Sequence, residues 1–231
     1  TSAEPANVPR DCPEGMVVIE CGELDSLEKA RGTARVATFC LDVHEVSVAA
    51  YSRLGGVPPK RTDWDNPAED SRASTFCNAN LPARDEHPVN CVSRDEAAAH
   101  CAKRGARVPT REWAARGGDD AYRTPWGSPV ATDQICWGKP RARFGTCEPG
   151  AFPRDMTAMG VANLGGNVSE WTTAPLRHEN RDGNRESPGP RFAHGASWYA
   201  IDDGYARAAL GGFQTPARRA ETIGFRCAAD R

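Results

Sequence analysis

The chain has no long hydrophobic run and no marked excess of charge of either sign. Its longest apolar segments are far shorter than the roughly 20 residues that a membrane-spanning helix needs. Lysine and arginine number 29 and aspartate and glutamate 31, which gives a formal net charge of −2. Nothing in this balance indicates a nucleic-acid partner or an anionic membrane surface. The sequence therefore predicts a globular protein without a membrane span.

The nine cysteines include no C-x-x-C pair, and their spacing does not match a zinc site. Reduced cytosolic proteins rarely carry so many cysteines without a metal-binding pattern, so disulfide bonds formed in an oxidising compartment are the better interpretation. The numbering begins at Thr1 without a methionine. We therefore interpret the chain as the mature form of an exported protein, whether periplasmic, cell-surface or secreted.

Length and composition indicate one domain that is rich in loops. A chain of 231 residues can bury one good core. The 22 glycines and 18 prolines favour irregular structure but do not reach a low-complexity composition. Residues 1–11 are polar and contain two prolines, which predicts a flexible tail. Residues 12–231 are then a single domain without internal repeats.

Two helices have clear boundary signals. Residues 47–54 are predicted to form a helix that Ser47 caps and that a pair of glycines stops. Residues 93–104 are the clearest helix, because Ser93 at the N-cap and Glu96 three residues later make a capping box and a glycine follows the last turn. Short strands are expected at residues 16–21 and 36–40, and a further short helix is expected from Thr110.

The segment Asn-Leu-Gly-Gly-Asn-Val-Ser-Glu-Trp, which begins at Asn163, is the most informative part of the chain. Glycine and asparagine tolerate positive φ, so they bend the backbone sharply and expose carbonyl oxygens on its inside. With the side-chain oxygens of Asn163 and Glu170, these carbonyls can surround a hard cation such as Ca²⁺, which takes six to eight oxygen ligands. The alternative is a buried tight turn whose asparagines bond to their own backbone.

Further motifs occur in a fixed order along the chain. They are Leu41-Asp-Val-His-Glu-Val-Ser47, His87-Pro-Val-Asn-Cys-Val-Ser93, Cys101-Ala-Lys-Arg-Gly-Ala-Arg-Val-Pro-Thr110, Ala114-Ala-Arg-Gly-Gly118, Pro125-Trp-Gly127, the Asn163 segment, Gly195-Ala-Ser-Trp198 and Ile223-Gly-Phe-Arg-Cys-Ala228. In this order and at this spacing they resemble the formylglycine-generating enzyme (sulfatase-modifying factor) family over roughly residues 12–228. The resemblance implies an α+β domain with an elaborated C-type-lectin-like fold, little regular secondary structure and disulfide cross-links.

Disulfides are expected between several of these blocks. The resemblance implies a bridge from Cys101 to Cys227, because the family joins the two blocks that contain them. Since nine is an odd number, one thiol is left over, which is either buried and inert or linked to a partner by an intermolecular disulfide. The other expected pairs are Cys136–Cys147, which flank a short polar loop, and Cys77–Cys91, which leaves Cys12, Cys21 and Cys40.

The family's copper site is absent from this sequence. In active members two cysteines near the C-terminus bind Cu(I) and oxidise a substrate cysteine to formylglycine, and soft thiolates suit Cu(I). The positions that match these cysteines are Ala200 and Tyr205, and no cysteine occurs between Cys147 and Cys227. The resemblance therefore implies the scaffold of the family without bound copper and without formylglycine-generating activity.

The family also binds Ca²⁺ through the block that matches the Asn163 segment. Carried over residue by residue, the ligands are the side chains of Asn163 and Glu170 and the carbonyl groups of Gly166 and Val168. Ser169 stands where the family usually has tryptophan, which leaves coordination possible but weakens the neighbouring packing. We expect one structural Ca²⁺ here. The alternative is that the same loop folds on hydrogen bonds alone.

The groove in which the family binds its substrate peptide is a second candidate site. A histidine and a carboxylate there could do acid–base work or hold an unrelated metal. The alternative is that the Asp-Asp-Gly sequence in this region is a turn between strands. We identify no catalytic residue. The candidate groove residues are His178, His194, Trp198, Tyr199, Asp202, Asp203 and Tyr205.

Two classes of function are compatible with the sequence. The first is an exported, non-catalytic binding module, a pseudoenzyme that recognises a peptide, protein or glycan in the former substrate groove. The second is a periplasmic enzyme of different chemistry, such as copper-free oxidation or maturation of a peptide-like substrate. A further possibility is a role in a larger extracellular assembly, linked through the odd cysteine. We favour the binding module, because the copper ligands are missing.

Overall fold

A computed structural model of the 231-residue chain is the basis of the description. It describes residues 11–20, 22–25, 33–57, 76–109, 133–137, 145–175, 191–200 and 211–231. The expected N-terminal tail and the expected helix after Thr110 lie outside these residues.

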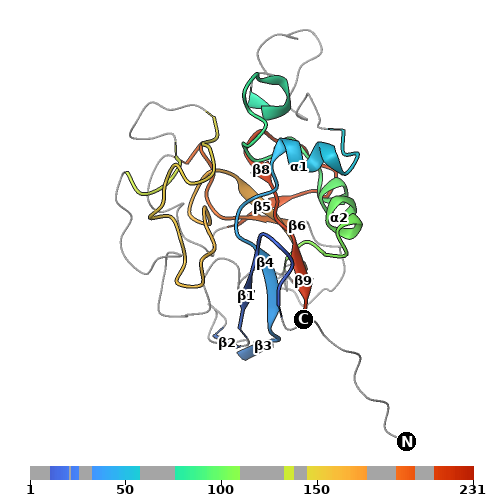
Figure 1. Ribbon diagram of the computed structural model, residues 1–231, viewed down its shortest axis with the longest axis vertical. Coiled ribbons are helices and arrows are strands. Elements are labelled where there is room, and N and C mark those ends of the chain that lie inside the picture. The colour runs from blue at the N-terminus through green and yellow to red at the C-terminus, as the bar shows by residue number, and fades with distance from the viewer. Residues whose placement is uncertain are drawn as a thin grey trace, which may run out of the picture.

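Three small sheets carry the strands of the described part of the chain (Figure 1). One is antiparallel, in the order β1-β4-β9, and joins the N-terminal strands to the last strand. A second has the order β7-β6-β5-β8, with β8 parallel to β5 and the other pairs antiparallel. β2 and β3 form an antiparallel pair. The strands are β1 (Met16–Ile19), β2 (Gly22–Asp25), β3 (Thr33–Val36), β4 (Phe39–Asp42), β5 (Ser169–Pro175), β6 (Arg191–His194), β7 (Gly211–Gln214), β8 (Ile223–Gly224) and β9 (Ala228–Asp230).

The two helices form where their capping signals predicted them. In α1 (Val48–Arg53) the Ser47 hydroxyl accepts a hydrogen bond from the first turn. In α2 (Arg94–Lys103) Ser93 and Glu96 make the predicted capping box, since each side chain accepts from the other's backbone N–H. A glycine with positive φ follows each helix. A short 3₁₀ helix, η2, spans Asn78–Asn80.

The main core lies where the helices meet the two larger sheets, and Figure 1 shows α1 and α2 together on one side of the molecule. The ring of His100 on α2 stacks on Tyr51 of α1 and meets the edge of Phe225. Trp171 on β5 is fully buried and its Nε1 donates to the Val92 carbonyl at 2.8 Å. These contacts fix the helices against the strand that follows the Asn163 segment.

Much of the fold is held without regular structure. Residues 145–168 contain no helix or strand, in keeping with the expected low content of regular elements. Hydrogen bonds from turns and side chains take the place of sheet ladders there. No helix among the described residues is long and apolar enough to cross a membrane.

Four disulfides cross-link the described segments, as is typical of proteins from oxidising compartments. The bridge between Cys101 and Cys227 ties α2 to the segment before β9 across 126 residues. The structure also pairs two of the three cysteines that the sequence left unassigned, and the third, Cys21, lies outside the described residues. The other three bridges are Cys12–Cys40, Cys77–Cys91 and Cys136–Cys147.

The length of chain that each bridge closes predicts its effect on stability. Replacing Cys101 and Cys227 together by serine should lower the free energy of unfolding by about 5 kcal/mol in the chain-entropy model. The same change at Cys77 and Cys91, which close only 14 residues, should cost about 3 kcal/mol. Urea unfolding of both double variants measures the difference. A smaller loss for the long bridge than for the short one would contradict the prediction.

Candidate functional site

The Asn163 segment forms a sharply bent, buried turn, as its glycines and asparagines predicted. Asn163 and Asn167 have φ values of 60° and 67°, in the left-handed region. Gly166 leaves no room for a side chain, because a Cβ there would lie 2.7 Å from the Cys136 carbonyl oxygen. The Asn167 Oδ1 accepts from the Cys147 backbone N–H at 2.9 Å. The turn is therefore packed against Cys136 and Cys147, the two residues of one disulfide bridge.

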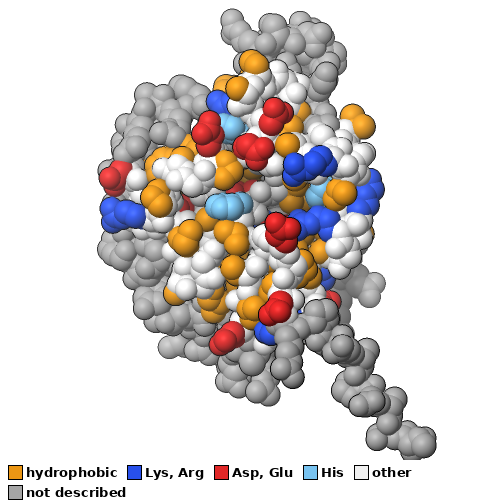
Figure 2. All heavy atoms as spheres, viewed as in Figure 1, with side chains coloured by type: hydrophobic (Ala, Val, Ile, Leu, Met, Phe, Trp, Pro, Cys, Tyr) orange, Lys and Arg blue, Asp and Glu red, His pale blue; other side chains and the backbone are white. Residues whose placement is uncertain are grey.

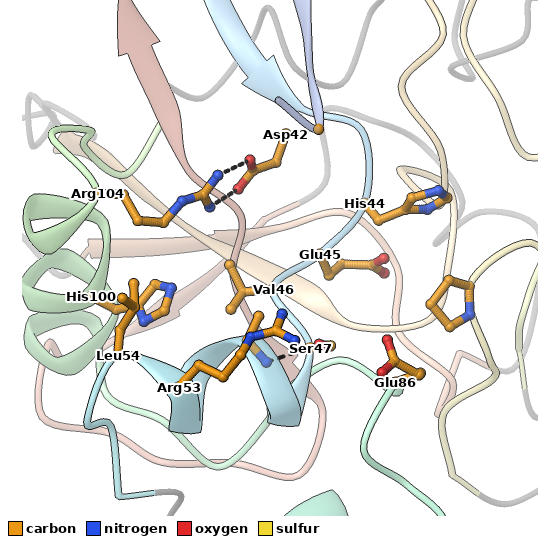
Figure 3. Close-up of a pocket in the computed structure, with 13 residues that line it drawn as sticks. Asp42, His44, Glu45, Val46, Ser47, Arg53, Leu54, Glu86, His100 and Arg104 are labelled. Atoms are coloured by element: carbon orange, nitrogen blue, oxygen red, sulfur yellow. Dashed lines mark hydrogen bonds and ion pairs between the residues drawn. The ribbon is translucent and has the colours of Figure 1, made fainter. Parts of the chain in front are cut away.

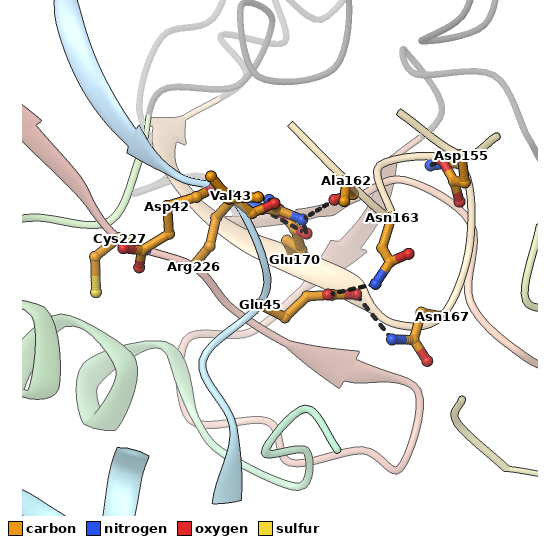
Figure 4. A network of polar contacts seen from close by, with 11 residues as sticks. Asp42, Val43, Glu45, Asp155, Ala162, Asn163, Asn167, Glu170, Arg226 and Cys227 are labelled. Carbon is orange, nitrogen blue, oxygen red and sulfur yellow. Dashed lines mark hydrogen bonds and ion pairs between the residues drawn. The ribbon is translucent and has the colours of Figure 1, made fainter. Parts of the chain in front are cut away.

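Arg226 is the central group of the site (Figure 4). Its guanidinium is fully buried and donates to both carboxylate oxygens of Glu170, at 2.6 to 2.9 Å. Its remaining N–H groups donate to the carbonyls of Asp42, Val43 and Ala162. Burial raises the pKa of Glu170, and the positive charge of Arg226 acts in the opposite direction. The pair joins β4, β5 and the turn to the segment after β8.

Glu45 connects the two bent asparagines. It is buried, and its two carboxylate oxygens accept from Nδ2 of Asn163 and Nδ2 of Asn167, each at 3.0 Å. Burial is the main cause that raises the pKa of Glu45, while Arg226 and the two amide hydrogen bonds lower it. Both side-chain partners of this carboxylate are neutral amides, and within the described residues no direct salt bridge balances its charge.

Asp155 is a third buried carboxyl group beside the turn. Its Oδ1 accepts from the Gly165 backbone N–H at 3.1 Å, but its buried Oδ2 has no hydrogen-bond partner. Burial raises the pKa of Asp155 to about 8, and the charges of Glu45 and Glu170 add to the effect. Figure 4 shows Asn163 between Glu45 and Asp155.

The network contains more carboxyl groups than guanidinium groups. Arg104 pairs with Asp42 through two hydrogen bonds of 2.7 Å, and Arg226 pairs with Glu170. Glu45 and Asp155 are left without a salt-bridge partner in the described part of the chain. A buried carboxylate must be protonated or balanced by a cation, because its transfer from water is costly.

The expected calcium ligands fit a hard cation in part. Asn163 uses only its amide nitrogen toward Glu45, so its Oδ1 remains suitable as a ligand. Both carboxylate oxygens of Glu170 accept hydrogen bonds from Arg226, so only their remaining lone pairs are available to a cation. The excess of buried carboxyl groups and the unpartnered Asp155 oxygen favour a cation. Among the described residues, however, no group of three or more His, Cys, Asp and Glu side chains has a metal-binding arrangement.

Sequence reasoning did not identify Glu45, Asp155 or Arg226 as part of this site. Glu45 is 118 residues from Asn163, and Arg226 is 56 residues from Glu170. No spacing rule connects residues so far apart. The one available signal was that Glu45 and Arg226 both lie within the quoted motifs.

The described groove candidates are mostly interior residues. Trp198 is 2% exposed and its Nε1 donates to the Glu221 carbonyl at 3.0 Å, while His194 is also buried. Tyr199, by contrast, is 64% exposed. Ala200, at a position of a copper ligand in active family members, is buried in an apolar cluster with Ile135, Trp137 and Ala196. His178, Asp202, Asp203 and Tyr205 lie outside the described residues.

A separate cleft of about 720 Å³ opens on the face shown in Figure 2. Its walls come from the segment between β4 and α1, from α1 and α2, and from Glu86 toward the other side (Figure 3). Pro149 also lines it. His44 and His100 both line it, and burial lowers the pKa of each imidazole, that of His100 to about 4. Sequence reasoning did not predict this cleft.

The buried imidazoles predict a loss of stability in acid. The pKa of His100 is lowered from 6.5 to about 4, first by burial and then by the charge of Arg104. The unfolded chain therefore takes up a proton below pH 6.5 that the folded chain refuses, so stability is full above pH 6.5 and falls as the pH drops toward 4. His100→Phe should keep the ring stack and flatten this slope. Melting temperatures measured from pH 4 to 7 test it, and an unchanged slope would contradict the assignment.

Comparison with known proteins identifies relatives of the chain. It is 32% identical over 193 residues to inactive C-alpha-formylglycine-generating enzyme 2 of Bos taurus, and the aligned region covers 77% of this chain and 59% of that protein. It is 31% identical over 212 residues to the formylglycine-generating enzyme of Mus musculus, covering 81% of this chain and 54% of that protein. The chain thus spans little more than half the length of these relatives.

Solved structures and family models agree with these relatives. The structure of PvdO from Pseudomonas aeruginosa superposes with a TM-score of 0.69 at 20% identity and covers all of both chains, which shows a shared fold. The model of the sulfatase-modifying factor enzyme 1-like domain matches residues 1–231. The fold, the buried turn and these matches together show that the chain belongs to the sulfatase-modifying factor (formylglycine-generating enzyme) family.

Proposed function

We propose that this protein is an exported, non-catalytic binding protein built on the formylglycine-generating-enzyme scaffold. The observation that carries the proposal is the absence of sulfur at the two positions that match the copper ligands, Ala200 and Tyr205. Eight of the nine cysteines are in disulfides, and the ninth, Cys21, cannot alone supply a two-thiolate Cu(I) site.

The surroundings of Ala200 support a loss of copper chemistry. The small apolar cluster that buries its side chain offers neither sulfur nor charge to a metal. The bovine relative that the chain resembles is named as inactive. On this proposal the former substrate groove keeps a recognition role, with Tyr199 on its exposed rim, and the ligand is a peptide, a protein or a glycan. The four disulfides suit a periplasmic, cell-surface or secreted location.

A direct assay separates the binding protein from an enzyme. The purified protein is incubated with Cu(I) and with a cysteine-containing peptide, and mass spectrometry follows the conversion of thiol to aldehyde. We expect neither stoichiometric copper nor formylglycine, whereas the mouse formylglycine-generating enzyme serves as the positive control. Peptide and glycan arrays then search for a ligand that is bound and released unchanged. Formylglycine formation, or chemical change in any captured ligand, would overturn the proposal.

The second part of the proposal is that the buried turn holds a structural Ca²⁺. Asn163, Glu170 and the carbonyls of Gly166 and Val168 are the ligands implied by the family. Support comes from the two buried carboxyl groups without salt-bridge partners and from the unpartnered Oδ2 of Asp155. A divalent cation would supply the positive charge that the described network lacks. Its role would be to stabilise the irregular segment on which the groove is built.

Two asparagines of the turn provide a matched test. Both have positive φ and both donate to Glu45, but only Asn163 is an expected ligand. Replacement by glycine preserves the backbone conformation at each position. We expect the native protein to melt at a higher temperature in Ca²⁺ than in EDTA. Asn163→Gly should abolish this difference. Asn167→Gly should lower the melting temperature in both conditions but keep the difference between them.

Calorimetric titration with Ca²⁺ should give one site in the native protein and none in Asn163→Gly. No calcium-dependent shift in the native protein would rule out the ion. Glu170→Ala is a poor test, because it also leaves the buried charge of Arg226 without its partner.

A further inference from the structure

The cleft beside α1 carries charged groups of both signs. Figure 3 shows Arg53 and Arg104 extending from α1 and the end of α2, while Glu45 and Glu86 lie toward the other side. Arg104 is already paired with Asp42, and Glu45 accepts two amide hydrogen bonds. The charges of these inner residues are therefore committed to the fold.

Two charged groups at the mouth of the cleft remain available. Arg53 and Glu86 both line it and are exposed, and neither makes an ion pair or side-chain hydrogen bond within the described part of the chain. A guanidinium recognises a carboxylate, and a carboxylate recognises an ammonium group. The opening thus presents one free cationic group and one free anionic group to the same ligand.

One histidine side chain is accessible from the cleft. His44 lines it and is partly exposed, and a neutral imidazole offers one donor and one acceptor to a bound polar group. His100 also lines the cleft, but its ring is 3% exposed and packs on Tyr51 and Phe225, so its nitrogens do not face a ligand.

Apolar side chains complete the cleft. Val46, Ala50, Leu54 and Pro149 all line it. The volume of about 720 Å³ falls within the range of small-molecule sites, which are largely apolar with a few placed polar groups. It exceeds what one small amino acid would fill.

We infer that this cleft binds a small peptide-like zwitterion, whose carboxylate pairs with Arg53, whose ammonium group pairs with Glu86 and whose apolar side chain contacts Val46, Ala50 and Leu54. The backbone amide of such a ligand meets the imidazole of His44. The site shares no residue with the former substrate groove or with the copper positions. Glu45 lines the cleft and also bonds to the buried turn, but none of the side chains proposed to contact the ligand belongs to the groove, the copper positions or the expected calcium ligands, so the inference is tested separately from the proposed function.

Binding of the dipeptide glycyl-leucine tests the inference on the native protein. Two-dimensional NMR of the backbone amides follows the titration, with N-acetylated, C-amidated and doubly blocked dipeptides as comparison ligands and free leucine to distinguish an amino acid from a peptide. The variants are Arg53→Gln and Glu86→Gln. The controls are Arg154→Gln and Glu20→Gln, which are equally exposed but do not line the cleft.

We expect saturable binding at millimolar concentrations, with shifts at α1 and α2. Each cleft variant should weaken binding roughly fivefold, the order of one partly exposed ion pair, and the controls should not. Arg53→Gln should have no effect on the C-amidated ligand, since that ligand lacks the carboxylate, and Glu86→Gln none on the N-acetylated one. Free leucine should bind more weakly than glycyl-leucine, because it lacks the backbone amide and fills less of the cleft.

Three results would overturn the inference. They are absence of saturable binding, equal binding of the doubly blocked dipeptide, and equal weakening in the control variants. All four variants alter exposed side chains, so none should change the fold. A circular dichroism melt that matches that of the native protein checks this and separates a loss of binding from a loss of folding.

Discussion

The buried pair of Arg226 and Glu170 is the contact on which the described fold depends. One guanidinium satisfies a carboxylate and three backbone carbonyls that lie up to 184 residues away in the sequence. The planar fork of arginine can make these bonds at once, and lysine cannot. Loss of either partner would leave a charge in the interior, at a cost of about 3–5 kcal/mol. The two larger sheets, the start of the bent turn and the C-terminal segment therefore meet at one residue.

Much of the backbone lies outside helices and sheets, so its N–H and C=O groups need other hydrogen-bond partners. The side chain of Asn90 accepts from the backbone N–H of Asn78 and donates to the carbonyls of Phe76 and Glu221. It thus supplies backbone hydrogen bonds that a neighbouring strand would supply in a sheet. The four disulfides limit the freedom of the unfolded chain between such contacts. A scaffold stabilised in this way can change its loops without losing its core.

On the proposed function, activity and scaffold are separable in this protein. The family's copper chemistry needs two thiolates, and Ala200 and Tyr205 stand at the positions that match them, while the buried network of Arg226 is present. The surfaces proposed to bind are the rim near Tyr199 and the cleft between Arg53 and Glu86. Because a fold alone does not specify an activity, these residues, rather than family membership, must carry any claim of function.

The sequence by itself determined the features that act over a few residues. The capping box at Ser93, the positive φ of Asn163 and the lack of copper thiols were all predictable, because a cap or a bend involves only neighbouring atoms and a missing sulfur is visible in any conformation. Tertiary structure alone decided that Arg226, Glu45 and Asp155 meet around one turn. The opposed charges of the cleft likewise come from separate segments. Such encounters depend on how distant segments pack and on which charges lose their water, and no local pattern encodes either.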